Sequence, residues 1–255
     1  MARKHRKVSG RPSRQSGIGD ILSRIVAIIL AIMIVAMATY WGLKFYEEWQ
    51  NRRAENERTQ QMGLSHDEVT DEDKANHVVD GADKPKSLSI PDANVDNARV
   101  QEIGLLQPSA NGSQQMDAPQ NVHDVGWYNC QINPVESKRC QNYISPLGVN
   151  NTDQAAVMDG HSCGGGACVF DGLADLKPGA EIIVTMGDDS QLTYVVDYVQ
   201  IVDLSDLDMT QAMMAYQPGR PGLNLITCDG AWNSRDSRGV RTMDRRVVVY
   251  STLRE

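Results

Sequence analysis

Residues 181–199 read EIIVTMGDDSQLTYVVDYV, and this stretch decides the class of fold. Residues 181–186 and 191–199 are rich in β-branched side chains, and one face of the second run collects Leu192, Tyr194, Val196 and Tyr198. The residues at 187–190 are turn formers, and their number suits the connection between two antiparallel strands. The stretch therefore predicts a β-hairpin with one buried face.

Short apolar runs of the same kind recur on both sides of this hairpin. They lie at residues 125–128, 154–159, 223–227 and 246–250, whereas residues 208–216 favour a short helix. Short strands at this spacing, with little helix, predict an all-β barrel or sandwich. The region after residue 118 is long enough to bury a core of its own.

The charges are divided between a basic head and an acidic body. Residues 1–53 hold 10 Lys and Arg against 3 Asp and Glu, a balance of +7, and the other 202 residues hold 15 against 30, or −15. Phosphate binding needs concentrated Lys and Arg, so this acidic body argues against nucleic acid as a partner.

An uncharged apolar run lies within the basic head. Residues 25–43 read IVAIILAIMIVAMATYWGL, and at about 1.5 Å per residue they span roughly 28 Å, close to the thickness of a bilayer core. Seven Lys and Arg precede the run against Asp20 alone, and this bias keeps residues 1–24 in the cytoplasm. We therefore expect a single-pass protein of the cell membrane, anchored in lipid through residues 25–43, with the rest of the chain outside.

Two alternatives stay open for this run. A buried helix of a soluble protein is one, and a cleaved signal peptide is the other, because Ala36-Met37-Ala38 has the small-x-small form of a cleavage site. The run is longer than the apolar part of a usual signal peptide, and we favour an uncleaved anchor.

The segment after the anchor is polar. Residues 47–61 favour a helix that continues the anchor, and residues 62–118 are rich in Asp, Asn, Ser, Gln and Pro. Such a composition buries too little apolar surface to offset the entropy of ordering the chain. We expect a helical extension and flexible stalk over residues 44–118, with a short docked strand near 100–106 as the open alternative, and a folded domain over 119–255.

All five cysteines lie in this outer domain, where disulfides are permitted. The odd number leaves one thiol over. Cys130 with Cys140 and Cys163 with Cys168 are the preferred local pairs among three connectivities, and Cys228 is then unpaired, either buried and structural or reactive. Their spacing fits no common zinc site, and we expect no metal and no cofactor.

Three strand ends carry the residues of one kind of chemistry. Gly160-His161 ends one apolar strand, Leu225-Ile226-Thr227-Cys228 ends a later one, and Arg245-Arg246 begins the last. This order resembles the sortases, membrane-anchored cysteine transpeptidases of bacterial surfaces. Their Thr-Leu-x-Thr-Cys strand corresponds to residues 224–228, with Asn224 in place of the first Thr.

Three further motifs are similar to the class F branch of this family. They are VGWY at 125–128, VFDGL at 169–173 and LKPG at 176–179, and the resemblance covers about residues 120–255. Two features depart from it: the segment between Tyr128 and Gln154 carries two cysteines, and Cys163 lies two residues from His161. The resemblance implies a sortase-like closed β-barrel of short strands with one or two short helices.

The resemblance assigns catalysis to Cys228, His161 and Arg246, and these residue types suit it. A thiol attacks as thiolate, and its ordinary pKa of about 8.5 falls beside cations. His161 can protonate the leaving amine, and Arg246 can bind the oxyanion of a thioacyl reaction. Neighbouring strand residues face opposite sides, so Arg245 is the alternative to Arg246.

The resemblance also implies the partners, which are an LPxTG-like sorting signal of surface proteins and the amine of a cell-wall precursor. Thr227, Met213 and Met214 are the candidate substrate-binding residues, with plain structural packing as the alternative. Calcium binding by acidic residues of the 202–221 connection is less favoured than a solvated acidic face; these residues are Asp203, Asp206 and Asp208.

Two other functions compete with a transpeptidase. The domain could mainly hydrolyse peptides as a cysteine endopeptidase, or it could be a non-catalytic extracellular module that binds peptides. An amide product distinguishes the first, and a free Cys228 thiol argues against the second.

Overall fold

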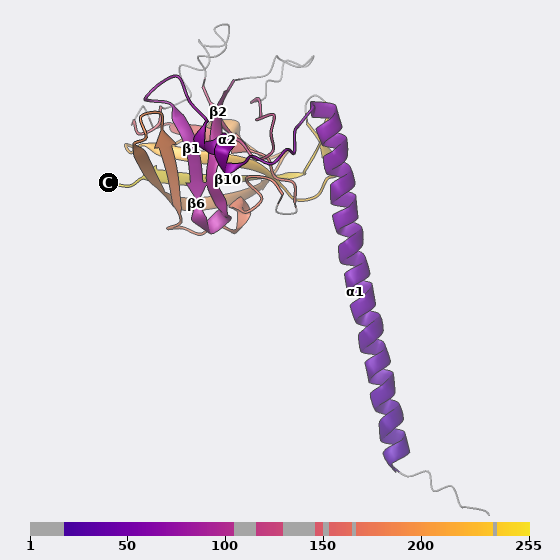
Figure 1. The fold of residues 1–255 in the computed structure, drawn as a ribbon. Coiled ribbons are helices and arrows are strands. Elements are labelled where there is room, and N and C mark those ends of the chain that lie inside the picture. Colours follow the sequence, from indigo (N-terminus) through magenta and orange to yellow (C-terminus); the bar gives the residue numbers. More distant parts are fainter. Residues whose placement is uncertain (1–17, 105–115, 130–145, 150–152, 165–166, 237–238) are drawn as a thin grey trace, which may run out of the picture. The chain divides into compact units, whose positions relative to one another are not determined.

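The computed structural model describes residues 18–104, 116–129, 146–149, 153–164, 167–236 and 239–255 (Figure 1). The chain divides into two compact units, Met1–Trp49 and Gln50–Glu255. Cys130 and Cys140 lie outside the described residues, and so does their predicted pairing.

The long helix α1 (Ile18–Met62) begins in the N-terminal unit, and its residues from Gln50 onward belong to the second unit. Its portion Ile21–Ala54 is long and apolar enough to cross a membrane: its most apolar 18-residue window has a mean hydropathy of 2.7, and none of that window is buried. An apolar helix left exposed in this way suits a lipid environment better than the core of a soluble protein. The helix continues without a break to Met62, over the predicted extension.

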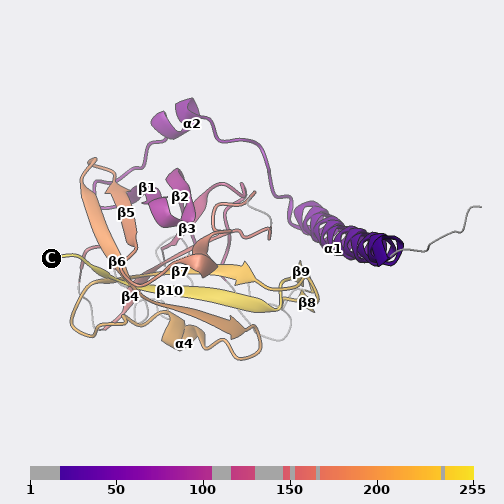
Figure 2. The ribbon, with the colours of Figure 1, turned by 90° about the horizontal axis from the view of Figure 1, so that it is seen from below.

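Eight strands close into one barrel in the second unit (Figure 2), which confirms the predicted class of fold. Their order around the barrel is β1-β2-β3-β4-β7-β10-β6-β5. The strands are β1 (Pro85–Ile90), β2 (Val95–Ile103), β3 (Val125–Tyr128), β4 (Ala155–Gly160), β5 (Glu181–Met186), β6 (Gln191–Asp203), β7 (Gly222–Asp229) and β10 (Arg245–Leu253).

Apart from α1, only short elements accompany the barrel within the described residues. They are α2 (Asp71–Ala75), η1 (Pro91–Ala93), η3 (Leu173–Asp175), α4 (Met209–Ala212) and a two-stranded ladder of β8 (Ser234–Arg235) and β9 (Arg241–Thr242). α4 lies within the stretch that predicted a helix. β8 and β9 lie in the connection between β7 and β10.

The barrel has an apolar interior and a second apolar cluster outside it. Alternate residues of β7 divide between the two, since Leu223 and Leu225 belong to the interior core and Ile226 to the outer cluster. Val247 and Val248 of β10 divide in the same way. The outer cluster also contains Ala212 of α4, so this helix covers the outer face of the β7–β10 region.

The predicted flexible stalk over residues 62–118 is wrong where it contains β1 and β2. These strands pair with each other, and β1 also pairs with β5, so the barrel cannot close without them. One buried side is enough for a strand, and alternating apolar residues supply it, among them Leu88, Ile90 and Val100. The average composition hid this pattern because the turns around it are polar.

The hairpin prediction is confirmed, with one exception in its alternation. β5 and β6 pair around the turn at 187–190, and Leu192, Tyr194 and Val196 face the core. Tyr198 is 47% exposed instead. The register of β6 against β10 shifts between Val196 and Tyr198, and a bulge of one residue turns Tyr198 to the other face.

Candidate active site

Strand register brings His161, Cys228 and Arg246 to one end of three neighbouring strands. Arg246 of β10 is paired with Cys228 of β7. β4 runs parallel to β7 with Asp159 opposite Ile226, and continuing this register by two residues sets His161 level with Cys228. Because Ile226 belongs to the outer cluster, all three residues lie on the outer face of the barrel.

A hydrogen bond from Thr227 supports this alignment. Its Oγ1 donates to the carbonyl oxygen of Gly160 at 2.8 Å, directly before His161. Thr227 is buried and its side chain points away from the face that carries Cys228. In this arrangement Thr227 ties the ends of β4 and β7 together, which is the packing alternative that the sequence left open.

His161 is 2% exposed, and one of its ring nitrogens has a defined role. Nε2 lies 2.8 Å from the carbonyl oxygen of Pro119, which can only accept a hydrogen bond. Nε2 therefore carries the proton of this hydrogen bond.

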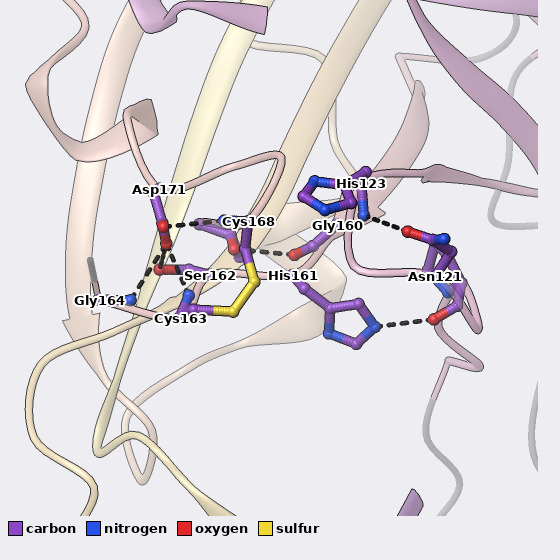
Figure 3. The surroundings of a disulfide bond; sticks show 11 residues. Asn121, His123, Gly160, His161, Ser162, Cys163, Gly164, Cys168 and Asp171 are labelled. Carbon is purple, nitrogen blue, oxygen red and sulfur yellow. Dashed lines mark hydrogen bonds between the residues drawn. A yellow bond between two sulfur atoms is a disulfide. The ribbon is translucent and has the colours of Figure 1, made fainter. Parts of the chain in front are cut away.

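The loop after His161 is built around the carboxylate of Asp171 and a disulfide (Figure 3). Cys163 and Cys168 form the disulfide, as predicted for this pair. The Asp171 carboxylate accepts hydrogen bonds from the backbone N–H groups of Cys163, Gly164 and Cys168 and from the Ser162 hydroxyl. In Figure 3 the His161 ring points away from the disulfide, toward the segment that carries Asn121.

Gly160 is required by the packing beneath His161. A Cβ at this position would lie 2.7 Å from the buried ring of Phe170 and 2.8 Å from Val169. Phe170 and Asp171 both belong to the VFDGL motif that supported the family resemblance. The motif thus shapes the loop that holds the histidine.

Arg246 and Cys228 share a neighbour in Thr242 of β9. The guanidinium Nη2 donates to Thr242 Oγ1 at 3.0 Å, and Nη1 donates to the carbonyl oxygens of Met243 and Arg245 at 3.0 and 2.7 Å. The Cys228 sulfur lies 3.8 Å from the same Oγ1 and is the free thiol of the described residues. Nothing in the sequence pointed to Thr242.

Arg245 faces away from this group. It is paired with Asp229, and its Nη2 lies 2.8 Å from the Asp229 carboxylate. The choice between the two arginines therefore has a geometric answer, since Arg246 is the one on the same face as Cys228.

The two methionines lie further along the barrel. Asn224 donates to the carbonyl oxygens of Ala212 and Met214, each at 2.8 Å, and at about 3.3 Å per residue Asn224 is roughly 13 Å from Cys228 along β7. Met213 packs against the outer cluster, whereas Met214 is 37% exposed. An extended peptide would have to span several residues to touch both Cys228 and these methionines.

The end of α1 contacts the connection between β7 and β10, which carries Thr242. Ala54 is fully buried in a cluster with Trp232 and Met243, against which Cys228 packs. Arg241 joins the same helix through Glu57, with Nη1 and Oε2 2.9 Å apart. The sequence predicted a helical extension here but gave no sign of these contacts.

Among the described residues, no three His, Cys, Asp or Glu side chains converge as a metal site would require. Asp208, one of the three acidic residues considered for calcium, instead caps α4 by accepting from the N–H of Thr210 at 2.9 Å. That interaction gives its carboxylate a structural role.

Comparison with known proteins gives one family match. The sortase domain model matches residues 142–254, which run from before β4 to β10 and include His161, Cys228 and Arg246. No curated protein matches the chain.

Several solved structures are similar to this chain. Sortase A from Listeria monocytogenes is 16% identical with a TM-score of 0.41, and the match covers 66% of this chain and 86% of that one. Sortase A from Corynebacterium diphtheriae is 18% identical with a TM-score of 0.42, covering 82% and 84%. Sortase C-1 from Actinomyces oris is 19% identical with a TM-score of 0.40, covering 66% and 72%.

Proposed function

Residues 142–254 make this chain a member of the sortase family, and we propose that it is a membrane-anchored cysteine transpeptidase. Its substrate is an LPxTG-like sorting signal of a surface protein, and its acceptor is an amine of a cell-wall precursor. Residues 1–24 face the cytoplasm, and the barrel acts outside the cell. The observation that carries the proposal is the register that puts His161, Cys228 and Arg246 on one face.

The first half-reaction forms a thioester. The Cys228 thiolate attacks the carbonyl carbon of the substrate threonine, and the carbonyl oxygen takes the negative charge. Arg246 is positioned to bind this oxyanion. The carbon–nitrogen bond then breaks, and Nδ1 of the His161 imidazolium gives its proton to the leaving amine.

The second half-reaction transfers the acyl group. The acceptor amine attacks the thioester carbon and gives a proton to the now neutral His161, and the carbon–sulfur bond breaks to restore the thiolate. The net result is one amide bond broken and one formed, with no oxidation or reduction. Water in place of the amine would give a hydrolase.

On the outer face the sorting signal would extend from Cys228 toward α4 and the 204–221 connection, which cover Ile226 and Asn224 of β7. Met213 and Met214 would contact the residues of the signal furthest from the scissile bond, and Thr227 would act indirectly by holding the strand ends together.

The test uses the full chain in detergent, beside Cys228→Ala and Cys163→Ser/Cys168→Ser. Each protein is incubated with an LPxTG-type peptide and an amine donor, and mass spectrometry follows the protein adduct and the peptide products. We expect an adduct on Cys228 and an amide product from wild type, and neither from Cys228→Ala. The disulfide variant should still form the adduct, because its cysteines do not take part in the chemistry.

Two results would overturn the proposal. An adduct that resolves only to the acid with every amine offered would make the protein an endopeptidase. A folded protein whose free Cys228 forms no adduct with a library of sorting-type peptides would indicate a binding module.

A further inference from the structure

We propose that Thr242 is a positioning residue, whose hydroxyl holds the Arg246 guanidinium and hydrogen-bonds the Cys228 sulfur. The inference rests on the proposed function and names a third group that prepares the nucleophile. It comes from the connection between β7 and β10, outside the strand-end motifs.

The directions of the hydrogen bonds support this role. A guanidinium can only donate, so Thr242 Oγ1 accepts from Arg246 Nη2 at 3.0 Å. The hydroxyl proton is then available to the Cys228 sulfur at 3.8 Å, and a thiolate is a stronger acceptor than a thiol. The three groups form one chain, in which the positive charge of Arg246 polarises the hydroxyl toward the sulfur.

The surroundings fix this hydroxyl in place. Thr242 is 4% exposed and is paired with Ser234 of β8, and its β-branched side chain has few rotamers. The preceding Arg241 donates from Nε to the carbonyl oxygen of Trp232 at 2.9 Å. The following Met243 supplies a carbonyl oxygen to Arg246. Residues 241–243 thus order the guanidinium before any substrate binds.

This preorganisation matters because Arg246 has two roles in the proposed reaction. It must face the sulfur when the thiolate forms, and it must face the oxyanion when the carbonyl is attacked. A guanidinium held on one side by Thr242 and backbone carbonyls keeps its remaining N–H groups in a fixed direction. Without the hydroxyl, Arg246 keeps its charge but loses the contact that aims it at Cys228.

The experiment compares Thr242→Val, which keeps the shape and removes the hydroxyl, with Thr242→Ser, which keeps the hydroxyl. The first measurement is the rate at which iodoacetamide alkylates Cys228 in the full chain between pH 5 and 10. The alkylation is followed on the peptide that contains Cys228. The second is the kcat and KM of transpeptidation. Thermal unfolding checks that each variant is folded.

For Thr242→Val we expect a rise in the pH at which the alkylation rate is half-maximal. We also expect kcat to fall about 10- to 100-fold, with KM little changed. Thr242→Ser should keep both within about threefold of wild type. An unchanged pH profile and kcat in folded Thr242→Val would overturn the proposal. Equal losses in both variants would also do so, because they would show that any change at this position is damaging and that the hydroxyl has no role of its own.

The alkylation measurement needs no peptide substrate, so it separates this proposal from the proposed function. A wild type that does not transpeptidate but whose alkylation profile shifts in Thr242→Val would overturn the function and keep the Thr242–Cys228 link. A transpeptidase whose Thr242→Val variant behaves as wild type would keep the function and remove the link.

Discussion

Arg246 lies directly opposite Cys228 across the antiparallel ladder of β7 and β10, whereas its neighbour Arg245 lies opposite Asp229. The two arginines are adjacent in sequence and equal in charge, yet the pleat of the strand sends them to opposite faces. Only Arg246 shares the outer face with Cys228, so the pair provides a matched test of the site.

We predict that Arg246→Gln lowers kcat by about 100- to 1000-fold, the usual effect of removing an oxyanion donor. Arg245→Gln should change it less than about threefold, because its ion pair with Asp229 is partly exposed and such pairs contribute little. Steady-state kinetics of both variants check this. The assignment fails if Arg245→Gln is the more damaged enzyme.

The disulfide beside His161 should stabilise its loop. Cys163→Ser/Cys168→Ser removes a short closed loop, and the chain-entropy relation gives a loss of about 2 kcal/mol in the free energy of unfolding. We also expect a lower kcat, because the segment after His161 is then held only by Asp171. Urea denaturation and kinetics measure the two effects, and an unchanged kcat would mean that Asp171 alone holds this loop.

Asp244 makes the loop after Cys228 sensitive to acid. The backbone N–H of Ala231 hydrogen-bonds its carboxylate at 2.9 Å and lowers the pKa of Asp244 below its ordinary 3.8. A folded-state pKa below the unfolded value stabilises the fold above about pH 4, and the contribution disappears as pH falls through the folded pKa. The Ala231 amide should lose its protection against hydrogen exchange as the pH falls through this pKa. The Asp244→Asn variant should show no such transition.

The end of α1 should support the active-site connection. Ala54→Leu places a larger side chain in the buried cluster with Trp232 and Met243, at a cost of about 1–3 kcal/mol. Asn56→Leu, on the exposed side of the same helix, is the control. We expect faster hydrogen exchange over residues 231–243 and a lower kcat for Ala54→Leu only. Equal behaviour of the two variants would show that this contact does not matter in solution.

The start of the folded domain can be tested with fragments. Residues 119–255 lack β1 and β2, which separate β3 from β5 in the barrel, and we expect this fragment to be insoluble or unfolded. Residues 50–255 keep all eight strands and the end of α1. Circular dichroism and thermal unfolding compare them, and a cooperative transition of 119–255 at the same temperature would contradict the barrel order.

The strands whose ends carry the candidate catalytic residues were the most predictable part of this protein. Cys228, His161 and Arg246 each follow or begin an apolar strand, and such strands are visible as local runs. β1 was not visible, and β2 was visible only as the open alternative of a docked strand near 100–106, because their apolar residues are interrupted by polar ones and the turns around them use residues typical of disorder. Asn94, for example, adopts a left-handed backbone conformation in the turn between β1 and β2, and so does Asn97 within β2 itself.

Sequence by itself thus determined the apolar helix, the all-β class and the three strand-end residues, because each depends on local pattern or on residue type. Tertiary structure alone decided which residues meet. Thr242 reaches Cys228 across 14 positions of the chain, and Glu57 reaches Arg241 across 184. Such contacts depend on strand register and on barrel closure, which are set by the packing of the whole domain and by no local stretch.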